Sequence, residues 1–153
     1  MNRNLLIFAV ILLVLVGAAY FTLNGRLGGK TVDIKGHTVK VEVADNEAEH
    51  TKGLSGRDPL AQDQGMLFVF NGQVQYPFWM KDMRFPIDII FLKDSKVAMI
   101  YDSVQPTVTV DGEKHQNLTL YPPPSGSTQV LEINAGLAKK YGLKVGDSIK
   151  VDL

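Results

Sequence analysis

Residues 76–92 read YPFWMKDMRFPIDIIFL, and this stretch decides how the rest of the chain is interpreted. Large apolar side chains, two prolines and four charged residues share these seventeen positions. Aromatic and β-branched residues in such runs are typical of strands. Pro86 lacks the amide that a sheet ladder needs, so it predicts a corner between two strands, residues 76–83 and residues 87–92.

The period of two in these strands places two carboxylates on otherwise apolar faces. Asp88 shares its face with an isoleucine and a leucine of its own strand, and Glu132 shares a face with Val130. A carboxylate in such surroundings has to be paired, hydrogen-bonded or protonated, because burying it unpaired costs several kcal/mol. Lys81 and Arg57 are the candidate partners for these two acids.

The remaining patterns predict a mainly β domain. Alternating apolar residues on both sides of Lys35-Gly36 predict a hairpin, and further strands are expected at residues 65–70, 97–101, 129–134 and 148–152. Two short helices are expected, one capped by Asn46 and Glu49 and the other over residues 135–141. Eight to ten strands with two small helices predict an antiparallel sandwich or a partly closed barrel, at the border of the α+β class.

The N-terminal part predicts a membrane segment. Residues 5–23 contain no charge and nearly match, as a helix, the roughly 30 Å hydrocarbon layer of a bilayer. We expect residues 1–23 to be an uncleaved signal anchor; the alternative is a signal peptide cleaved near residue 18, which releases a secreted protein. Residues 24–30 are then a linker, and residues 31–153 a single soluble domain outside the cytoplasm, periplasmic or extracellular.

Composition argues against several classes of site. The chain has no cysteine, which removes disulfides, thiol nucleophiles and thiolate metal sites. After residue 30, thirteen basic residues face sixteen acidic ones, a net charge of about −3 that does not favour nucleic acid. The histidines lack metal-binding spacing, and no phosphate-binding loop or dinucleotide fingerprint is present. We therefore expect no metal, no cofactor and no nucleic-acid partner.

Four motifs occur in a fixed order: GLSGR at residues 53–57, GMLF at 65–68, FWMKDM with PIDIIF across 78–91, and VLEINAG at 130–136. Together they resemble the bacterial and archaeal family labelled domain of unknown function 192, over about residues 38–153. The resemblance implies a compact, mainly β domain, often behind an N-terminal signal or anchor, with no established activity. Relatives typically carry asparagine after the tryptophan-methionine-lysine motif, where this chain has Asp82.

The resemblance marks the residues that the strand pattern also selects, and these form the predicted ligand-binding site: Arg57, Trp79, Lys81, Asp88 and Glu132. The first hypothesis is a membrane-anchored domain that binds a small polar ligand, carbohydrate or envelope-derived, with Trp79 as the apolar wall. An alternative is a hydrolase or lyase that uses Asp88 or Glu132 as base, with Lys81 or Arg57 stabilising the negative charge that develops. Another is a structural or assembly protein of the cell envelope whose charges fix the strand register. Protein partners are unknown from the sequence.

Overall fold

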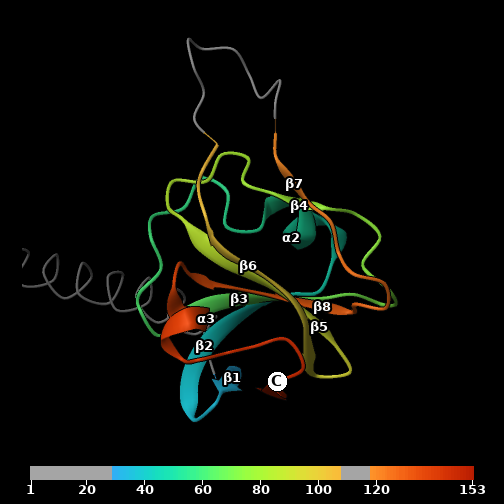
Figure 1. The fold of residues 1–153 in the computed structure, drawn as a ribbon. Coiled ribbons are helices and arrows are strands. Elements are labelled where there is room, and N and C mark those ends of the chain that lie inside the picture. Colours follow the sequence, from blue (N-terminus) through green and yellow to red (C-terminus); the bar gives the residue numbers. More distant parts are fainter. Residues whose placement is uncertain (1–28, 108–117) are drawn as a thin grey trace, which may run out of the picture.

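The structure, a computed structural model, describes residues 29–107 and 118–153 (Figure 1). These residues form two short helices, α2 (Glu47–Lys52) and α3 (Leu137–Lys140). They also form nine strands: β1 (Thr31–Ile34), β2 (His37–Ala44), β3 (Gln64–Val69), β4 (Phe78–Trp79), β5 (Ile87–Lys93), β6 (Lys96–Val104), β7 (Leu120–Tyr121), β8 (Gln129–Asn134) and β9 (Lys150–Asp152).

Seven of the strands form one strongly curled sheet in the order β6-β5-β8-β3-β2-β1-β9, while β4 pairs with β7 in a second, small sheet. Among the pairs within these sheets, only β2 and β3 run parallel. The sheet edges approach each other at one end, where Lys96 bridges Ser148 and the Val97 amide donates to the Asp147 carbonyl (2.9 Å). The fold is therefore a half-barrel, and the predicted mainly β class with two short helices is confirmed.

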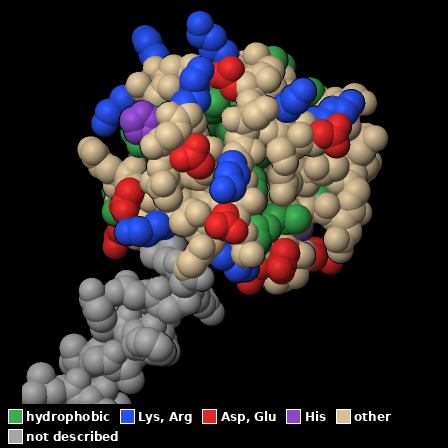
Figure 2. Space-filling model, turned by 90° about the horizontal axis from the view of Figure 1, so that it is seen from below, with side chains coloured by type: hydrophobic (Ala, Val, Ile, Leu, Met, Phe, Trp, Pro, Cys, Tyr) green, Lys and Arg blue, Asp and Glu red, His purple; other side chains and the backbone are tan. Residues whose placement is uncertain are grey.

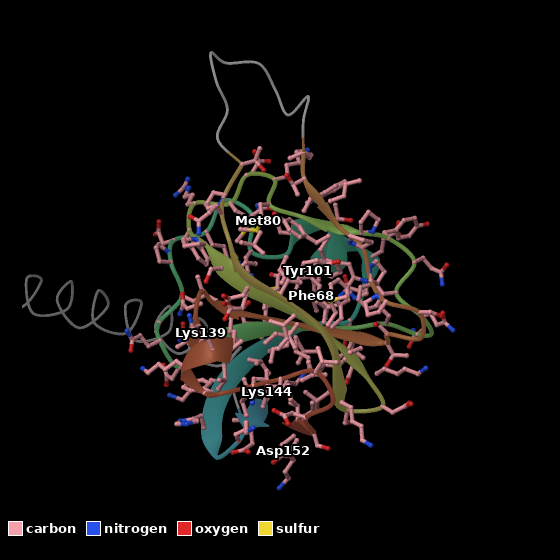
Figure 3. The ribbon with its side chains drawn as sticks, in the orientation of Figure 1. Phe68, Met80, Tyr101, Lys139, Lys144 and Asp152 are labelled. Carbon is pink, nitrogen blue, oxygen red and sulfur yellow. The ribbon has the colours of Figure 1, made fainter. Side chains whose placement is uncertain are left out.

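The curled sheet carries an apolar layer on each face. We call one side the α3 face; α3 and the segment leading to β9 cover it, and its layer includes Leu67, Ile90 and Leu131. The opposite side is the α2 face, where α2, β4 and β7 lie (Figure 1). Figure 3 shows Phe68, Met80 and Tyr101 on the α2 face, with Lys139 and Lys144 on the side of α3.

Charge is mixed over the surface that Figure 2 shows. Lysine and arginine side chains alternate there with aspartate and glutamate, and hydrophobic side chains appear between them only in small areas. Four ion pairs join such charges in the described part of the chain, including Lys35 with Asp147 and Lys40 with Asp63. The pairs made by Lys35, Lys40 and Arg84 are exposed and each contributes little to stability, whereas the pair of Arg57 with Glu42 is partly buried.

Several local predictions are confirmed. The β1–β2 hairpin turns at Lys35 and Gly36, both at positive φ, as a two-residue turn requires. The run at residues 65–70 is β3, which lies in the middle of the large sheet and is buried on both faces. The predicted strand at residues 129–134 coincides with β8.

The predicted strand over residues 76–83 is wrong in its length. Only Phe78–Trp79 form a strand, and they pair with β7 instead of joining the large sheet. Asp82 has a φ of 56°, which no extended strand allows. At this turn the loop after α2 makes two hydrogen bonds to the chain, one to Lys81 and one to Asp82.

Gly65 sets the spacing between β3 and β8. A Cβ at this position would lie 2.7 Å from the Glu132 carbonyl oxygen and 3.0 Å from Cγ2 of Ile133. We expect Gly65→Ala to lower the free energy of unfolding by about 1–3 kcal/mol, as overpacking of a core typically does. Urea denaturation measures this loss, and an alanine variant as stable as the wild type would contradict the close approach.

The predicted membrane segment, residues 5–23, lies outside the described residues, as do the boundaries at residues 23 and 24. Among residues 29–107 and 118–153, no helix has the length and apolar character to cross a bilayer. The expected anchor and linker therefore stay predictions.

Candidate functional site

A cavity of about 610 Å³ opens on the α2 face of the large sheet. Its walls come from α2, from the loop after α2, from the segment after β3 and from β4. The sheet itself contributes Glu132 of β8. Ligand pockets span about 300–1,000 Å³, so this volume fits a small organic molecule.

Helix α2 is fixed at both ends, which holds its residues over the cavity. The Glu49 amide donates to Oδ1 of Asn46 (3.1 Å), and the Asp45 amide donates to the Glu49 carboxylate (3.2 Å). The predicted capping box is therefore present, except that the Glu49 carboxylate accepts from the amide of Asp45 and not from that of Asn46. Gly53 ends the helix at a φ of 44°, and its amide donates to the Glu49 carbonyl (2.8 Å).

His50 ties α2 to the large sheet. Its Nε2 lies 3.0 Å from the Ala44 carbonyl oxygen and 3.1 Å from the Val69 carbonyl oxygen. Two carbonyl acceptors require a hydrogen on Nε2, which leaves Nδ1 as an acceptor in the neutral ring. The imidazole stacks on Phe70 at 4.2 Å between ring centroids. No sequence motif marked His50; its place in the last turn of a predicted helix was the one available signal.

Aromatic side chains form much of the cavity wall. Phe78 packs edge-on against Phe68 and Phe91, with ring centroids 5.1 and 5.5 Å away, so the core holds its ring in place. Trp79 and Tyr76 also line the cavity but are 47% and 77% exposed. The wall is thus rigid near the sheet and open to solvent at Trp79 and Tyr76.

Glu132 is the buried acid of the cavity. Its side chain is on the α2 face with Val130, as the strand period predicts, and only 5% of the residue is exposed. None of the described residues hydrogen-bonds to its carboxyl or pairs with it. Burial raises the pKa of Glu132 from its ordinary value of 4.5 to about 8. The acid is therefore protonated at neutral pH, and an unpaired buried group of this kind often marks a functional site.

Two hydrogen bonds connect the GLSGR motif to the turn after β4. Oγ of Ser55 donates to the Lys81 carbonyl (2.9 Å), and the Gly56 amide donates to the Asp82 carbonyl (2.8 Å). These bonds hold the loop after α2 against the end of β4, so two motifs far apart in sequence shape one rim of the cavity. Asparagine tolerates a positive φ better than most residues. The positive φ of 56° at Asp82 suits both asparagine and aspartate, so this turn accepts either residue.

Arg57 and Lys81 lie beside the cavity and do not line it. Arg57 pairs with Glu42 (2.6 Å between Nη1 and Oε1), and Met66 separates this pair from Glu132 on the same face of the sheet. Lys81 is exposed and borders a neighbouring open groove that also contacts Trp79. Neither cation is bonded to Glu132 or Asp88, the acids for which the sequence suggested them as partners.

Asp88 lies on the α3 face, away from the cavity. It is fully buried, and its carboxylate accepts hydrogen bonds from the amides of Ser103 (2.8 Å), Gly136 (2.9 Å) and Ala138 (2.8 Å). Burial raises the pKa of Asp88, while the three amide bonds oppose that shift. The residue thus joins β5 to β6 and to the start of α3. This arrangement fits the structural alternative for Asp88.

The structure therefore divides the predicted site. Trp79 and Glu132 line one cavity, and Lys81 and Arg57 lie beside it. Asp88 lies on the other face of the sheet. Sequence reasoning missed the contributions of α2 and of the segment after β3, which bring His50 and Phe70 to the cavity. No cluster of three or more metal-binding side chains occurs among the residues that the structure describes.

Comparison with known proteins identifies one family and similar solved structures. The family model DUF192, described as an uncharacterized ACR, matches residues 30–151. A crystal structure of a protein of unknown function from Novosphingobium aromaticivorans DSM 12444 is similar, with 34% identity, coverage of 80% of this chain and 83% of that one, and a TM-score of 0.67. A putative transcription regulator from Sinorhizobium meliloti 1021 shows 28% identity, 80% and 91% coverage, and a TM-score of 0.64. No curated protein matches the chain.

Proposed function

The chain belongs to DUF192, an uncharacterised family, and from its site we propose that the domain is a binding module for a small, largely apolar ligand with one polar group. The apolar part of the ligand contacts the rings of Phe70, Phe78 and Trp79, and its polar group bonds to Glu132. Of the five predicted residues, the proposal keeps Trp79 and Glu132 in the binding site, and it adds Phe70 and Phe78.

One observation carries this proposal: the buried Glu132 carboxyl has no partner among residues 29–107 and 118–153, and it faces a cavity walled by aromatic side chains. Buried polar groups are ordinarily hydrogen-bonded, because a buried group without a partner lowers stability. A carboxyl that is kept in such a place therefore calls for a functional explanation. A ligand that bonds to Glu132 supplies the missing partner. Binding pockets commonly combine apolar walls with a few placed polar groups of this kind.

The test is a thermal-shift screen of small aromatic and aliphatic compounds on the full-length chain. A compound present at 100 times its Kd should stabilise the wild type by about 2.7 kcal/mol, because it binds only the folded state. Trp79→Ala should reduce this effect strongly, because the indole covers the ligand at the open side of the cavity. Leu120→Ala is the matched control, since Leu120 pairs with Trp79 across the small sheet but does not line the cavity.

Stabilising compounds that act equally on the wild type and on a folded Trp79→Ala variant would count against the proposed cavity. Loss of the effect in Leu120→Ala as well would point to damage of the small sheet and not to a lost ligand contact. Both variants replace half-exposed side chains, so both are expected to fold.

The hydrolase or lyase alternative has weaker support. Glu132 can act as a general acid near neutral pH because burial raises its pKa to about 8. Asp88, the second carboxylate that this alternative invoked, lies on the opposite face of the sheet. Arg57 is engaged by Glu42, which removes one of the two cations suggested for charge stabilisation. Binding is therefore the better supported function.

We further propose that residues 5–23 anchor the domain to a membrane and that the domain lies outside the cytoplasm. The uncharged nineteen-residue run and the glycine-containing linker of residues 24–30 support this location. In that setting the cavity samples small molecules of the envelope or the surrounding medium. Mass measurement of the mature protein tests the anchor, since cleavage near residue 18 would release a shorter, secreted chain.

A further inference from the structure

We propose that the cavity takes an organic cation, with an ammonium group held against Glu132 among the aromatic rings. This inference rests on the proposed binding function and names the class of its ligand. It assigns the polar group of the ligand a positive charge, which the binding proposal alone leaves open.

The environment of the Glu132 carboxyl favours a cationic ligand. On the large sheet its cross-strand neighbours are Met66 of β3 and Ile89 of β5, and neither can donate a hydrogen bond to an acid. Among the described residues no cation reaches Glu132. An ammonium ligand provides both a positive charge and hydrogen-bond donors, which none of the described residues provides to Glu132, whereas a neutral ligand provides at most a hydrogen bond.

The aromatic wall of the cavity also favours a cation. The faces of aromatic rings carry negative potential and attract organic cations, most strongly when the cation is shielded from water. Phe70, Phe78, Trp79 and Tyr76 contribute four rings to a single cavity. Aromatic side chains around one acid form the kind of pocket that recognises an ammonium head group.

Of the ionisable groups near the cavity, Glu132 is the one placed to bind the ammonium group. On α2 the cavity is lined by Glu47, His50 and Lys52, of which Glu47 and Lys52 are exposed, and Tyr76 lies at the open side. Glu42, on the same face of the sheet, is engaged by Arg57. Asp88 is separated from the cavity by the sheet itself. Glu132 is therefore the only buried acid that lines the cavity among the described residues.

Binding of a cation is coupled to loss of a proton. Burial raises the pKa of Glu132 to about 8, so the free protein holds the acid protonated at neutral pH. A cation favours the ionised acid, and the proton leaves to solvent as the complex forms. Affinity for a cation should therefore increase with pH by up to about tenfold per pH unit below about 8, whereas affinity for a neutral ligand should not increase.

The experiment compares two probes of similar size on the full-length chain by calorimetry, at about pH 6 and about pH 8. 2-Phenylethylammonium, the protonated form of 2-phenylethylamine, is positively charged at both pH values and carries N–H donors, and 2-phenylethanol is its neutral counterpart. The Kd of the cation should fall at least about tenfold between the two pH values, with release of a proton at the lower one. The Kd of 2-phenylethanol should show no such fall.

Two variants locate the effect. Glu132→Gln should remove the pH dependence of cation binding. A pH dependence that came from His50, Glu47 or Lys52 would persist in this variant. Trp79→Ala should weaken cation binding at both pH values and keep the pH dependence.

An equal Kd for the cation at both pH values would overturn the inference. If 2-phenylethanol alone binds, and Trp79→Ala abolishes that binding, the inference fails while the binding function stands. If neither probe binds, the inference fails, and the thermal-shift screen decides separately whether the cavity binds ligands at all.

Discussion

Replacement of Asp88 by alanine is expected to lower the free energy of unfolding by about 3–5 kcal/mol. The substitution leaves the amides of Ser103, Gly136 and Ala138 without an acceptor, and each unsatisfied buried donor costs about 1–3 kcal/mol. Small domains are stable by about 5–15 kcal/mol, so this loss removes a large part of the total. Urea denaturation near neutral pH measures it.

Asp94→Asn is the matched control for this prediction. Asp94 is an exposed carboxylate in the turn between β5 and β6, so its replacement should change stability by less than about 0.5 kcal/mol. Asp88→Asn keeps one oxygen as an acceptor and should give an intermediate loss. An Asp88→Ala variant as stable as the wild type would remove the structural role and restore Asp88 as a candidate for ligand binding.

Asp88 and Glu132 show that a strand pattern predicts the neighbours of a residue within its own strand but not its position relative to other strands. A period of two correctly grouped Asp88 with Ile90 and Glu132 with Val130 within their own strands. It could not say whether the two acids share a face, because that depends on the register between β5 and β8. In that register Ile89 is opposite Glu132 and Asp88 is opposite Ile133. A shift of one residue would have placed both acids on one face.

The cavity was less predictable than the sheet because its walls depend on long-range contacts. Residues 76–83 resemble a strand in composition, yet bonds from Ser55 and Gly56 hold Lys81 and Asp82 in a turn. Local propensity cannot anticipate such bonds between distant segments. The capping box of α2 was predicted from sequence, but the bonds of His50 to the Ala44 and Val69 carbonyls required the folded sheet.

Glu132→Gln is expected to stabilise the protein by about 4 kcal/mol near pH 8 and to change its stability little near pH 5. The folded-state pKa of Glu132 is raised from 4.5 to about 8 by burial. Between these values the unfolded chain loses the proton while the folded protein keeps it. The wild type therefore loses stability as pH rises through this window, by about 1.4 kcal/mol per pH unit. Glutamine keeps the shape of the protonated acid and cannot ionise.

The measurement is the free energy of unfolding of both proteins at several pH values between about 5 and 8.5, obtained from urea denaturation. The difference between wild type and variant isolates Glu132, because Asp88 and all other acids titrate in both proteins. Hydrogen bonds from Lys40 and Lys35 lower the pKa values of Asp63 and Asp147, so these acids lose their contribution only below that range. Glu47→Gln, at an exposed residue that also lines the cavity, should leave the slope with pH unchanged. A wild type and a Glu132→Gln variant with parallel pH profiles would mean that Glu132 is not held protonated. The coupling of cation binding to proton release would then lose its basis.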